Sequence, residues 1–209
     1  MELQFGAIRR DELKEAAQLS ARAYDDYVYV TNYFPDDEER RRGSPLLMHC
    51  VKKVNYGKTH ILTAKADGRL AGVAQLDDPS YRKPSAFQYI RHGFLRLYLM
   101  FGLRRVNAFL AMDEAAALPC HDYQKTGPGI WYLCMLEVEP ALQGKGIGTR
   151  FIAWMEDYIR ERGGRELVLL TNSEKNLAFY RNRGFQVFHE CEIVHEGRRM
   201  GSWSLKKAL

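Results

Sequence analysis

The chain has 209 residues, of which 46% are hydrophobic and 27% charged. This length suits one folding unit, and 17 glycines with 7 prolines are too few for a low-complexity or collagen-like chain. Lys and Arg number 31 against 26 Asp and Glu, which gives a net charge of +5. The densest charged run, residues 38–42, mixes both signs and is typical of a solvated helix face. We therefore expect a single domain over residues 1–209 with no nucleic-acid partner.

The thiols and imidazoles of the chain show no pattern of a disulfide framework or a metal site. No C-x-x-C pair links the four scattered cysteines, which indicates reduced thiols, and the histidines lack metal-ligand spacing. No histidine stands where it would activate Cys134 or Cys191, so an acyl-cysteine mechanism is not expected. Residues 1–12 lack a signal-peptide core, and no run of 18 uncharged apolar residues occurs. We expect a cytoplasmic monomer or homodimer without metal or stable membrane association.

The N-terminal half predicts helices followed by a hairpin. Residues 11–24 have the apolar spacing of an amphipathic helix, with Asp11 placed to cap it. Five aromatic residues crowd the segment 24–34, which we interpret first as core filling and second as the wall of a ligand cleft. Residues 45–55 predict a short helix. Residues 61–66 and 70–76 predict two strands joined by Asp67-Gly68, a dipeptide favoured in two-residue turns that need positive φ.

The segment 77–129 is the least regular part of the chain. It contains a basic and aromatic stretch at 87–105, an Ala-rich helix around 109–118 and a turn at 127–129. Basic amphipathic stretches can lie on membrane surfaces. The apolar residues of 87–105 are nearly continuous, however, and this favours a helix packed over the mouth of a ligand site.

The pattern becomes clearer from residue 130 onward. It predicts a strand at 130–138, a helix at 144–162, a strand at 165–171, a short helix at 174–182 and a strand at 185–194. This order, after an antiparallel hairpin, predicts a mixed sheet with helices packed on it.

A glycine-rich loop joins the predicted strand 130–138 to the helix that follows. Alternating glycines let the backbone expose successive N–H groups, and the free amides of the helix add to this anion site. The spacing fits neither the Walker A motif nor the dinucleotide G-x-G-x-x-G motif. The loop and its flanks consist of Gln143, Gly144, Lys145, Gly146, Ile147, Gly148 and Thr149.

This loop, together with a second motif, resembles the GCN5-related N-acetyltransferase (GNAT) superfamily. Its Q/R-x-x-G-x-G/A signature matches residues 143–148, and its N-x-x-x-F/Y-Y-x-x-x-G-F element is close to residues 176–185. Residues 131–133, 138–140 and 170–171 also look like the branch that contains puromycin N-acetyltransferase. Much of that branch has histidine where this chain has Ile130, so the substrate of the branch is not carried over.

The resemblance implies a fold and an activity. The fold is a GNAT-type α/β (α+β) arrangement: a mixed, mostly antiparallel twisted sheet flanked by helices, whose central parallel strands splay to form a CoA cleft. The activity is transfer of an acetyl group from acetyl-CoA to a primary amine of a small molecule or peptide, by direct attack in a ternary complex. The alternative is a non-catalytic CoA-binding sensor or interaction module of the same fold.

The resemblance also implies roles for individual residues. The amides of 144–149 would hold the CoA pyrophosphate next to Gln143, and the backbone of Leu136 to Val138 would pair with the pantetheine arm. Asn176 would hydrogen-bond the cofactor, and Tyr180 would protonate the leaving thiolate. The sequence supports the last two roles independently, because Asn176 and Tyr180 share one face of a short helix that Ser173 can cap. A phenol is a plausible proton donor to a thiolate.

The attacking amine must lose a proton, and Glu137 is the candidate base because it lies mid-strand where a cleft could desolvate it. Glu139 competes for this role, and His121-Asp122 and Tyr132 are weaker alternatives. We expect the insertion 77–129 to form part of the acceptor pocket. A cationic acceptor is only hinted at by the carboxylates beside the aromatic cluster. Cations near the loop suit a polyanionic cofactor; they are Lys145, Arg150 and Lys175.

Overall fold

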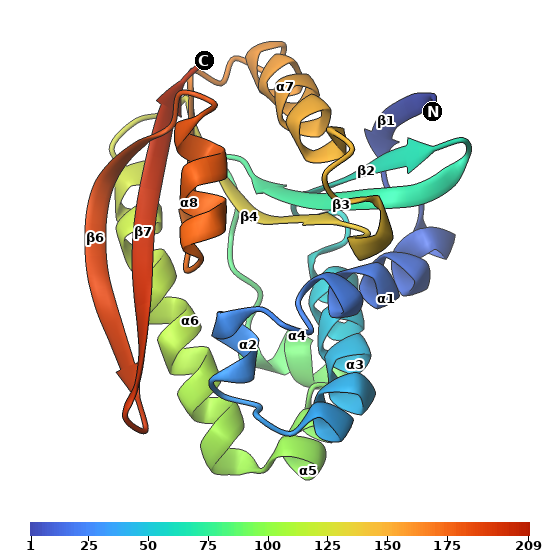
Figure 1. Cartoon of the computed structure of the whole chain (residues 1–209), viewed down its shortest axis with the longest axis vertical. Coiled ribbons are helices and arrows are strands. Elements are labelled where there is room, and N and C mark those ends of the chain that lie inside the picture. Colours follow the sequence, from blue (N-terminus) through green and yellow to red (C-terminus); the bar gives the residue numbers. More distant parts are fainter.

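A seven-stranded sheet in the order β1-β2-β3-β4-β5-β7-β6 organises the protein, and the computed structural model describes all of residues 1–209 (Figure 1). Only β4 and β5 pair in parallel; every other neighbouring pair is antiparallel. This confirms the mixed, mostly antiparallel sheet. The strands are β1 Leu3–Ala7, β2 His60–Ala66, β3 Arg69–Asp77, β4 Ile130–Val138, β5 Glu166–Thr171, β6 Gln186–His195 and β7 Arg198–Ala208.

Helices cover both faces of the sheet. The helices are α1 Leu13–Ala23, α2 Val28–Thr31, α3 Asp37–Asn55, α4 Ala86–Arg91, α5 Leu95–Phe101, α6 Leu103–Gln124, α7 Ile147–Arg160 and α8 Glu174–Arg181, with 3-10 turns η1 Arg10–Glu12 and η2 Pro140–Leu142. Successive strand residues point to opposite faces. Leu62 of β2 accordingly packs with α7, whereas its neighbour Ile61 packs with α1. Helix α6 lies on the same side as α1, where Ala117 and Cys120 contact Ile130.

Helix α7 starts three residues later than the sequence predicts. The loop residues Gly144 and Gly146 have φ of +77° and +79°, a left-handed conformation that interrupts a right-handed helix. The apolar spacing of the sequence over this helix predicts a buried stripe of six residues; five of them are buried, whereas Tyr158 is only half-buried and hydrogen-bonds His60 at 2.9 Å. The buried members are Ile147, Phe151, Ile152, Met155 and Ile159.

The N-terminal helices differ from the prediction in their caps and lengths. Asp11 does not cap α1. The Glu12 carboxylate instead accepts the Arg9 backbone N–H at 2.8 Å, and Asp11 pairs with the Arg9 guanidinium at 3.3 Å. Helix α3 begins eight residues before the predicted start at 45, because Asp36 accepts the N–H of Glu39 at 2.7 Å and caps an earlier first turn.

The insertion 77–129 builds a second hydrophobic core beside the sheet. Residues from α5 and α6 pack there with Phe34, Leu47 of α3 and Met200 of β7. Helix α6 extends beyond the predicted 109–118, and the Pro119 within it does not end it. Strands β1 and β7 were not predicted. In β7 the buried positions Ser202 and Ser204 are polar, so the strand shows no apolar alternation.

Candidate functional site

The central parallel strands separate halfway along their length. Pairing between β4 and β5 runs from Ile130↔Glu166 to Leu133↔Leu169 and then stops. Strand β4 has a bulge here, since β3 pairs Leu76 with Leu133 and the next residue, Gln75, with Met135, which leaves Cys134 unpaired. From Cys134 to Leu136 the strand becomes partly exposed, although Ile130–Leu133 are buried. The edge of β4 facing β5 over 134–138 therefore has no strand partner, which confirms the predicted splay.

The glycine-rich loop presents an unbroken run of free amides beside this opening. None of the six consecutive backbone N–H groups from Gly144 to Thr149 donates a hydrogen bond, whereas Gln143 and Arg150 on either side both do. Residues 143–146 are exposed, and a Cβ on Gly144 or Gly146 would meet no atom within 4 Å. Six unpaired donors at the N-terminus of a 14-residue helix form an anion-binding site for phosphate groups.

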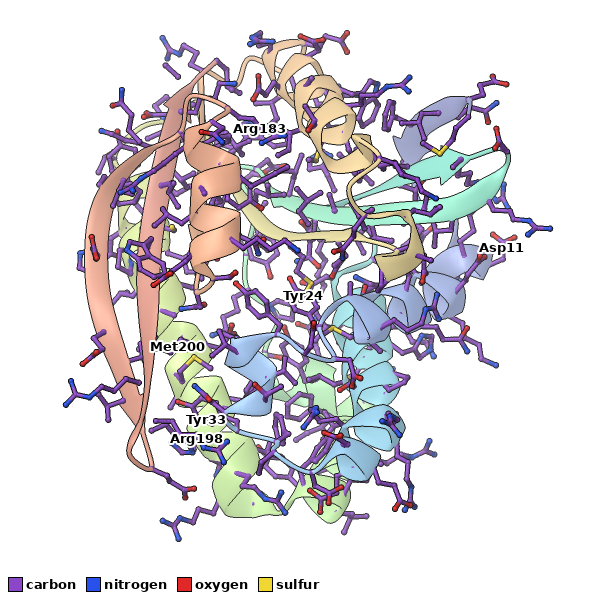
Figure 2. The ribbon with its side chains drawn as sticks, viewed as in Figure 1. Asp11, Tyr24, Tyr33, Arg183, Arg198 and Met200 are labelled. Atoms are coloured by element: carbon purple, nitrogen blue, oxygen red, sulfur yellow. The ribbon has the colours of Figure 1, made fainter.

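A cation next to the loop was missed by the sequence analysis. The Arg183 guanidinium lies 3.5 Å from the centre of the Phe179 ring, donates to the Phe179 carbonyl at 2.5 Å and contacts the Thr149 hydroxyl. Figure 2 shows Arg183 between α8 and α7. Its Nε has no partner. The i+4 spacing from Phe179 was a signal available in the sequence.

Tyr180 reaches the opening from α8. The side chain is 8% exposed and packs edge-on against Phe179 and Phe185 at centroid distances of 5.2 and 5.5 Å. Its hydroxyl makes no hydrogen bond within the protein. Burial raises the pKa of Tyr180, and nearby Tyr27 and Glu137 raise it further, so the phenol stays protonated at neutral pH.

Asn176 lies one turn earlier on α8, half-buried, with a side-chain amide that makes no hydrogen bond within the protein. Ser173 precedes the helix as predicted, but its hydroxyl makes no capping bond. Its backbone N–H instead donates to the Thr171 hydroxyl at 3.3 Å. The end of β5, rather than a serine cap, holds this end of α8.

Glu137 is buried beneath α1 and α3 rather than facing solvent. It is 2% exposed, and the bulge at Cys134 turns it toward the same side as Met135, which packs on Ala17 and Ala21. Oε1 lies 3.5 Å from Nζ of Lys52, and Oε2 has no partner. Burial raises the pKa of Glu137, and the Lys52 ammonium opposes that rise.

The Lys52 side chain is fully buried, and its role was not predicted from the sequence. Met48 and Asn55, one turn before and after it on α3, are buried as well, so Lys52 lies on the buried face of the helix. A lysine on the buried face of a helix needs an acidic partner.

Two tyrosines of the N-terminal aromatic segment lie near Glu137 and Tyr180. Tyr27 binds the end of β5, because its hydroxyl accepts the Asn172 N–H at 3.0 Å and lies 3.1 Å from the Thr171 hydroxyl. Tyr24 stacks edge-on with Tyr27 at 5.4 Å and lies below β4 in Figure 2. Burial raises the pKa of Tyr24, and Glu137 is the next contributor. Core filling is confirmed for Tyr33 and Phe34, whereas Tyr24 and Tyr27 are only partly buried.

The comparison with protein families agrees with this geometry. A family model described as the acetyltransferase (GNAT) family matches residues 18–185, well over half of the chain. The chain belongs to the GNAT acetyltransferase family. As a member it is an N-acetyltransferase that uses acetyl-CoA. None of the curated proteins compared is similar enough in sequence to count as a relative.

Solved structures of other GNAT acetyltransferases share the fold. A GCN5-related N-acetyltransferase of Rhodopseudomonas palustris is 15% identical, with a TM-score of 0.60 over 100% of this chain and 97% of that one. A candidate acetyltransferase of Salmonella typhimurium, solved with its cofactor acetyl-CoA, is 14% identical with a TM-score of 0.58 over 99% and 93%. The ribosomal-protein-S18-alanine N-acetyltransferase of Escherichia coli is 11% identical, with a TM-score of 0.58 over 99% and 94%.

Several polar residues that the sequence suggests for the site form contacts with other residues of the protein. Glu139 forms a two-point pair with Arg22 of α1, at 3.2 and 2.6 Å. The His121 ring lies 4.9 Å from the buried Tyr132 ring, and Asp122 pairs with Lys125 at 2.9 Å. The Gln143 amide donates to the Val138 carbonyl at 3.2 Å.

Of the four carboxylates that hinted at a cationic acceptor, three have structural partners and the fourth, Asp26, is exposed without one. Asp25 and Asp37 pair with Arg40, and Asp36 caps α3. A different acid, Asp113 of α6, accepts the Tyr29 hydroxyl and forms no ion pair. Its helix face also carries buried members, namely Phe109, Ala116, Ala117 and Cys120, yet Asp113 is exposed. This face of α6 therefore opens to solvent at Asp113.

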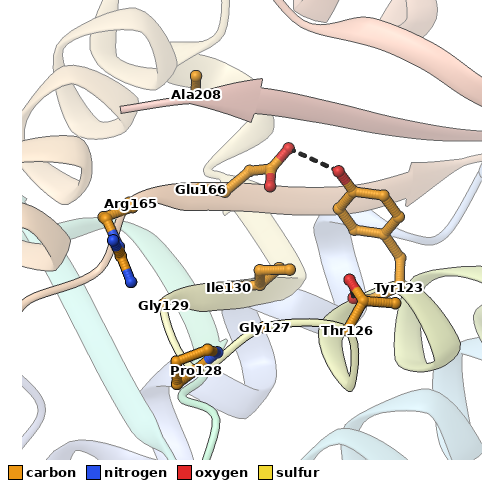
Figure 3. A pocket seen from close by; sticks show the side chains of 9 residues that line it. All are labelled: Tyr123, Thr126, Gly127, Pro128, Gly129, Ile130, Arg165, Glu166 and Ala208. Carbon is orange, nitrogen blue, oxygen red and sulfur yellow. Dashed lines mark hydrogen bonds between the residues drawn. The ribbon is translucent and has the colours of Figure 1, made fainter.

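A surface depression lies at the other end of β4 and β5, around the turn 127–129 (Figure 3). Tyr123 donates to Glu166 there at 3.0 Å, and Lys206 donates to the Tyr123 hydroxyl at 3.0 Å. Ile130 and Glu166 form the first parallel pair, whereas the splay starts beyond Leu133. The depression thus lies at the opposite end of the β4–β5 pairing from the splay.

Proposed function

We propose that this GNAT enzyme transfers the acetyl group of acetyl-CoA to a primary amine of a small molecule or peptide, by direct attack in a ternary complex. The observation that carries the proposal is the run of six unpaired amides, 144–149, next to the unpaired edge of β4. Both features are backbone groups without partners in the protein, side by side and accessible to a ligand. One ligand that needs both is a pyrophosphate joined to an arm that contains amides.

The residues present fit acetyl-CoA. The amides of 144–149 would bind the pyrophosphate, with Lys145, Arg150 and Arg183 adding positive charge around it. The free edge of β4 from Leu136 to Val138 would pair with the pantetheine amides in the manner of an added strand. The free amide of Asn176 would donate to the same arm. Bound there, acetyl-CoA supplies a thioester-activated acetyl group.

Two buried side chains would move the protons. Glu137 would take the proton of the amine, directly or through a water molecule. Burial raises the pKa of Glu137, so this carboxylate is a stronger base than an exposed carboxylate. Tyr180 would donate its hydroxyl proton to the departing thiolate, since that hydroxyl has no partner within the protein. Glu137 is among the groups that raise the pKa of Tyr180, which supports placing both at one site.

The acceptor would enter from the side built by the insertion 77–129. Asp113 of this insertion accepts the Tyr29 hydroxyl and forms no ion pair, and the phenols of Tyr24, Tyr27 and Tyr29 lie between it and Glu137. The successive ring distances are 5.4 and 6.3 Å. Phenol faces and a free carboxylate suit an acceptor that carries positive charge. The four free cysteines also suit a cytoplasmic enzyme.

The decisive experiment is detection of free CoA thiol when the protein is mixed with acetyl-CoA and a panel of primary amines. Release of CoA that depends on both enzyme and amine would support acetyl transfer. A thermal shift with acetyl-CoA in the absence of turnover with any amine would favour the non-catalytic sensor instead.

A further inference from the structure

Exposed apolar side chains concentrate on one short part of the chain. Of the nine large hydrophobic residues that are exposed, five fall within residues 87–103, and Leu99 is 87% exposed. We call this set the α4–α6 patch; its members are Phe87, Ile90, Leu95, Leu99 and Leu103. A concentration of this kind marks an interaction surface more often than a folding defect.

The helices that carry the patch have two apolar faces. On α5, Phe94, Leu97 and Phe101 are buried in the second core, whereas Leu95 and Leu99, one turn apart, face outward. Phe87 and Ile90 are likewise three residues apart on α4. From the sequence we expect these apolar residues to be packed against the protein. That holds for one face, and the other is without a partner.

The same part of the chain carries positively charged side chains and no negatively charged ones. No Asp or Glu occurs between Asp78 and Asp113, and six cations do: Arg82, Lys83, Arg91, Arg96, Arg104 and Arg105. Three of them form ion pairs outside the segment: Lys83 with Glu114, Arg104 with Glu196 and Arg105 with Glu39. The guanidinium groups of Arg82, Arg91 and Arg96 are exposed and form no ion pair. This segment accounts for the whole surplus of +5.

We propose that the α4–α6 patch docks this enzyme reversibly on an anionic membrane surface. Leucine and phenylalanine side chains would enter the boundary between headgroups and acyl chains, and the three unpaired arginines would bind lipid phosphates. A second copy of the chain would fit less well, because a two-fold contact through this patch brings the same arginines toward one another. A nucleic acid would satisfy the arginines but leave the leucines without a partner.

Docking through the α4–α6 patch would orient the enzyme on the membrane in a way that is compatible with catalysis. Helix α5 lies at the end of the molecule farthest from α7 (Figure 1). The glycine-rich loop at the start of α7 would therefore remain open to acetyl-CoA while the patch is on the membrane. No helix of the protein is long and apolar enough to span a bilayer.

Vesicle co-sedimentation tests the proposal. Three unpaired arginines predict binding to phosphatidylcholine vesicles that contain phosphatidylserine about 100-fold tighter than binding to phosphatidylcholine alone. Added salt should weaken the binding. Leu99→Glu and Arg96→Glu should each reduce it, whereas Leu118→Glu, at an exposed leucine of α6 outside the patch, should not. An unchanged thermal shift with acetyl-CoA would show that the variants are folded.

Three results would overturn the proposal. One is no binding to the anionic vesicles, and another is equal binding to both compositions. The third is a concentration-dependent dimer in sedimentation equilibrium that Leu99→Glu abolishes, because that result would assign the patch to a second copy of the chain. None of these measurements depends on acetyl transfer, so the two proposals can fail separately.

Discussion

The ammonium nitrogen of Lys52 lies 3.5 Å from the Oε1 atom of Glu137, and both side chains are buried. Each is the other's only ionic partner, and the second carboxylate oxygen has none. Burial raises the pKa of Glu137 and so favours its protonated form, which cannot accept a proton from an amine. Lys52 therefore acts on the site through Glu137, by holding down a pKa that burial raises.

We expect Lys52→Met to shift the pH dependence of the reaction. Activity requires ionised Glu137, so it falls as the pH drops through the pKa of that group. Removing Lys52 raises this pKa, and the acid limb of kcat/KM should move to higher pH. Once the pKa lies one unit above the assay pH, only about a tenth of the enzyme is active. A pH profile measured at saturating acetyl-CoA checks this.

The double variant Lys52→Met/Glu137→Gln separates structure from chemistry. A buried carboxylate without its cation costs about 3–5 kcal/mol of stability unless it takes up a proton. The neutral amide removes that cost, so the double variant should unfold at a higher denaturant concentration than Lys52→Met. It should nevertheless remain inactive at every pH. Full activity of Glu137→Gln would contradict the base assignment.

Tyr180→Phe tests the proton donor. The ring keeps its contacts with Phe179 and Phe185, so the KM for acetyl-CoA should change little. Loss of the donated proton should lower kcat by about 10²- to 10⁴-fold. Tyr123→Phe, at the far end of the strands, is the matched control and should leave kcat unchanged. Retained turnover in Tyr180→Phe would remove Tyr180 from the mechanism.

The sequence predicted the C-terminal half of the fold better than the N-terminal half, for a physical reason. Strand β4 was predicted at its observed limits because eight of its nine residues are uncharged, and α7 because its apolar spacing is regular. Helix α3 is mostly polar in its first turns, so Pro45 was read as its start. Strand β7 buries serines, which carry no periodic apolar signal.

Some residues of the candidate site could likewise be predicted from the sequence, and others could not. The loop 143–149 and Tyr180 belong to local motifs, so their neighbours in sequence reveal them. Lys52, Arg183 and Asp113 become part of the site only through contacts with residues 34 to 85 positions away, or through the path of a helix in the insertion. The i+4 spacing of Phe179 and Arg183 was a local signal, but no local pattern indicates the long-range contacts of Lys52 or Asp113.

Asp113→Asn tests the acceptor side. If Asp113 holds a positive charge on the acceptor, its neutral amide should raise the KM for a diamine about tenfold or more, the loss of one charge-assisted hydrogen bond. A monoamine of the same chain length should be affected less, and the KM for acetyl-CoA should not change. Asp122→Asn, on the same helix and paired with Lys125, is the control. An equal effect on both amines would exclude Asp113 as a charge anchor.

Gly146→Ala tests the loop, and the chain supplies a matched control in Gly163→Ala. Both glycines have left-handed φ, +79° and +76°, and at both a Cβ would meet nothing within 4 Å. Each alanine should therefore cost a similar 1–2 kcal/mol or so of stability through backbone strain alone.

Only Gly146 belongs to the run of free amides, so only Gly146→Ala should disturb their direction. We expect its KM for acetyl-CoA to rise about tenfold, the effect of losing about 1.4 kcal/mol of binding. The KM of Gly163→Ala should stay at the wild-type value, although both variants unfold at a lower temperature. Equal KM values in the two variants would mean that strain, and not the phosphate contact, explains any loss. In that case the amides of 144–149 would not hold the cofactor.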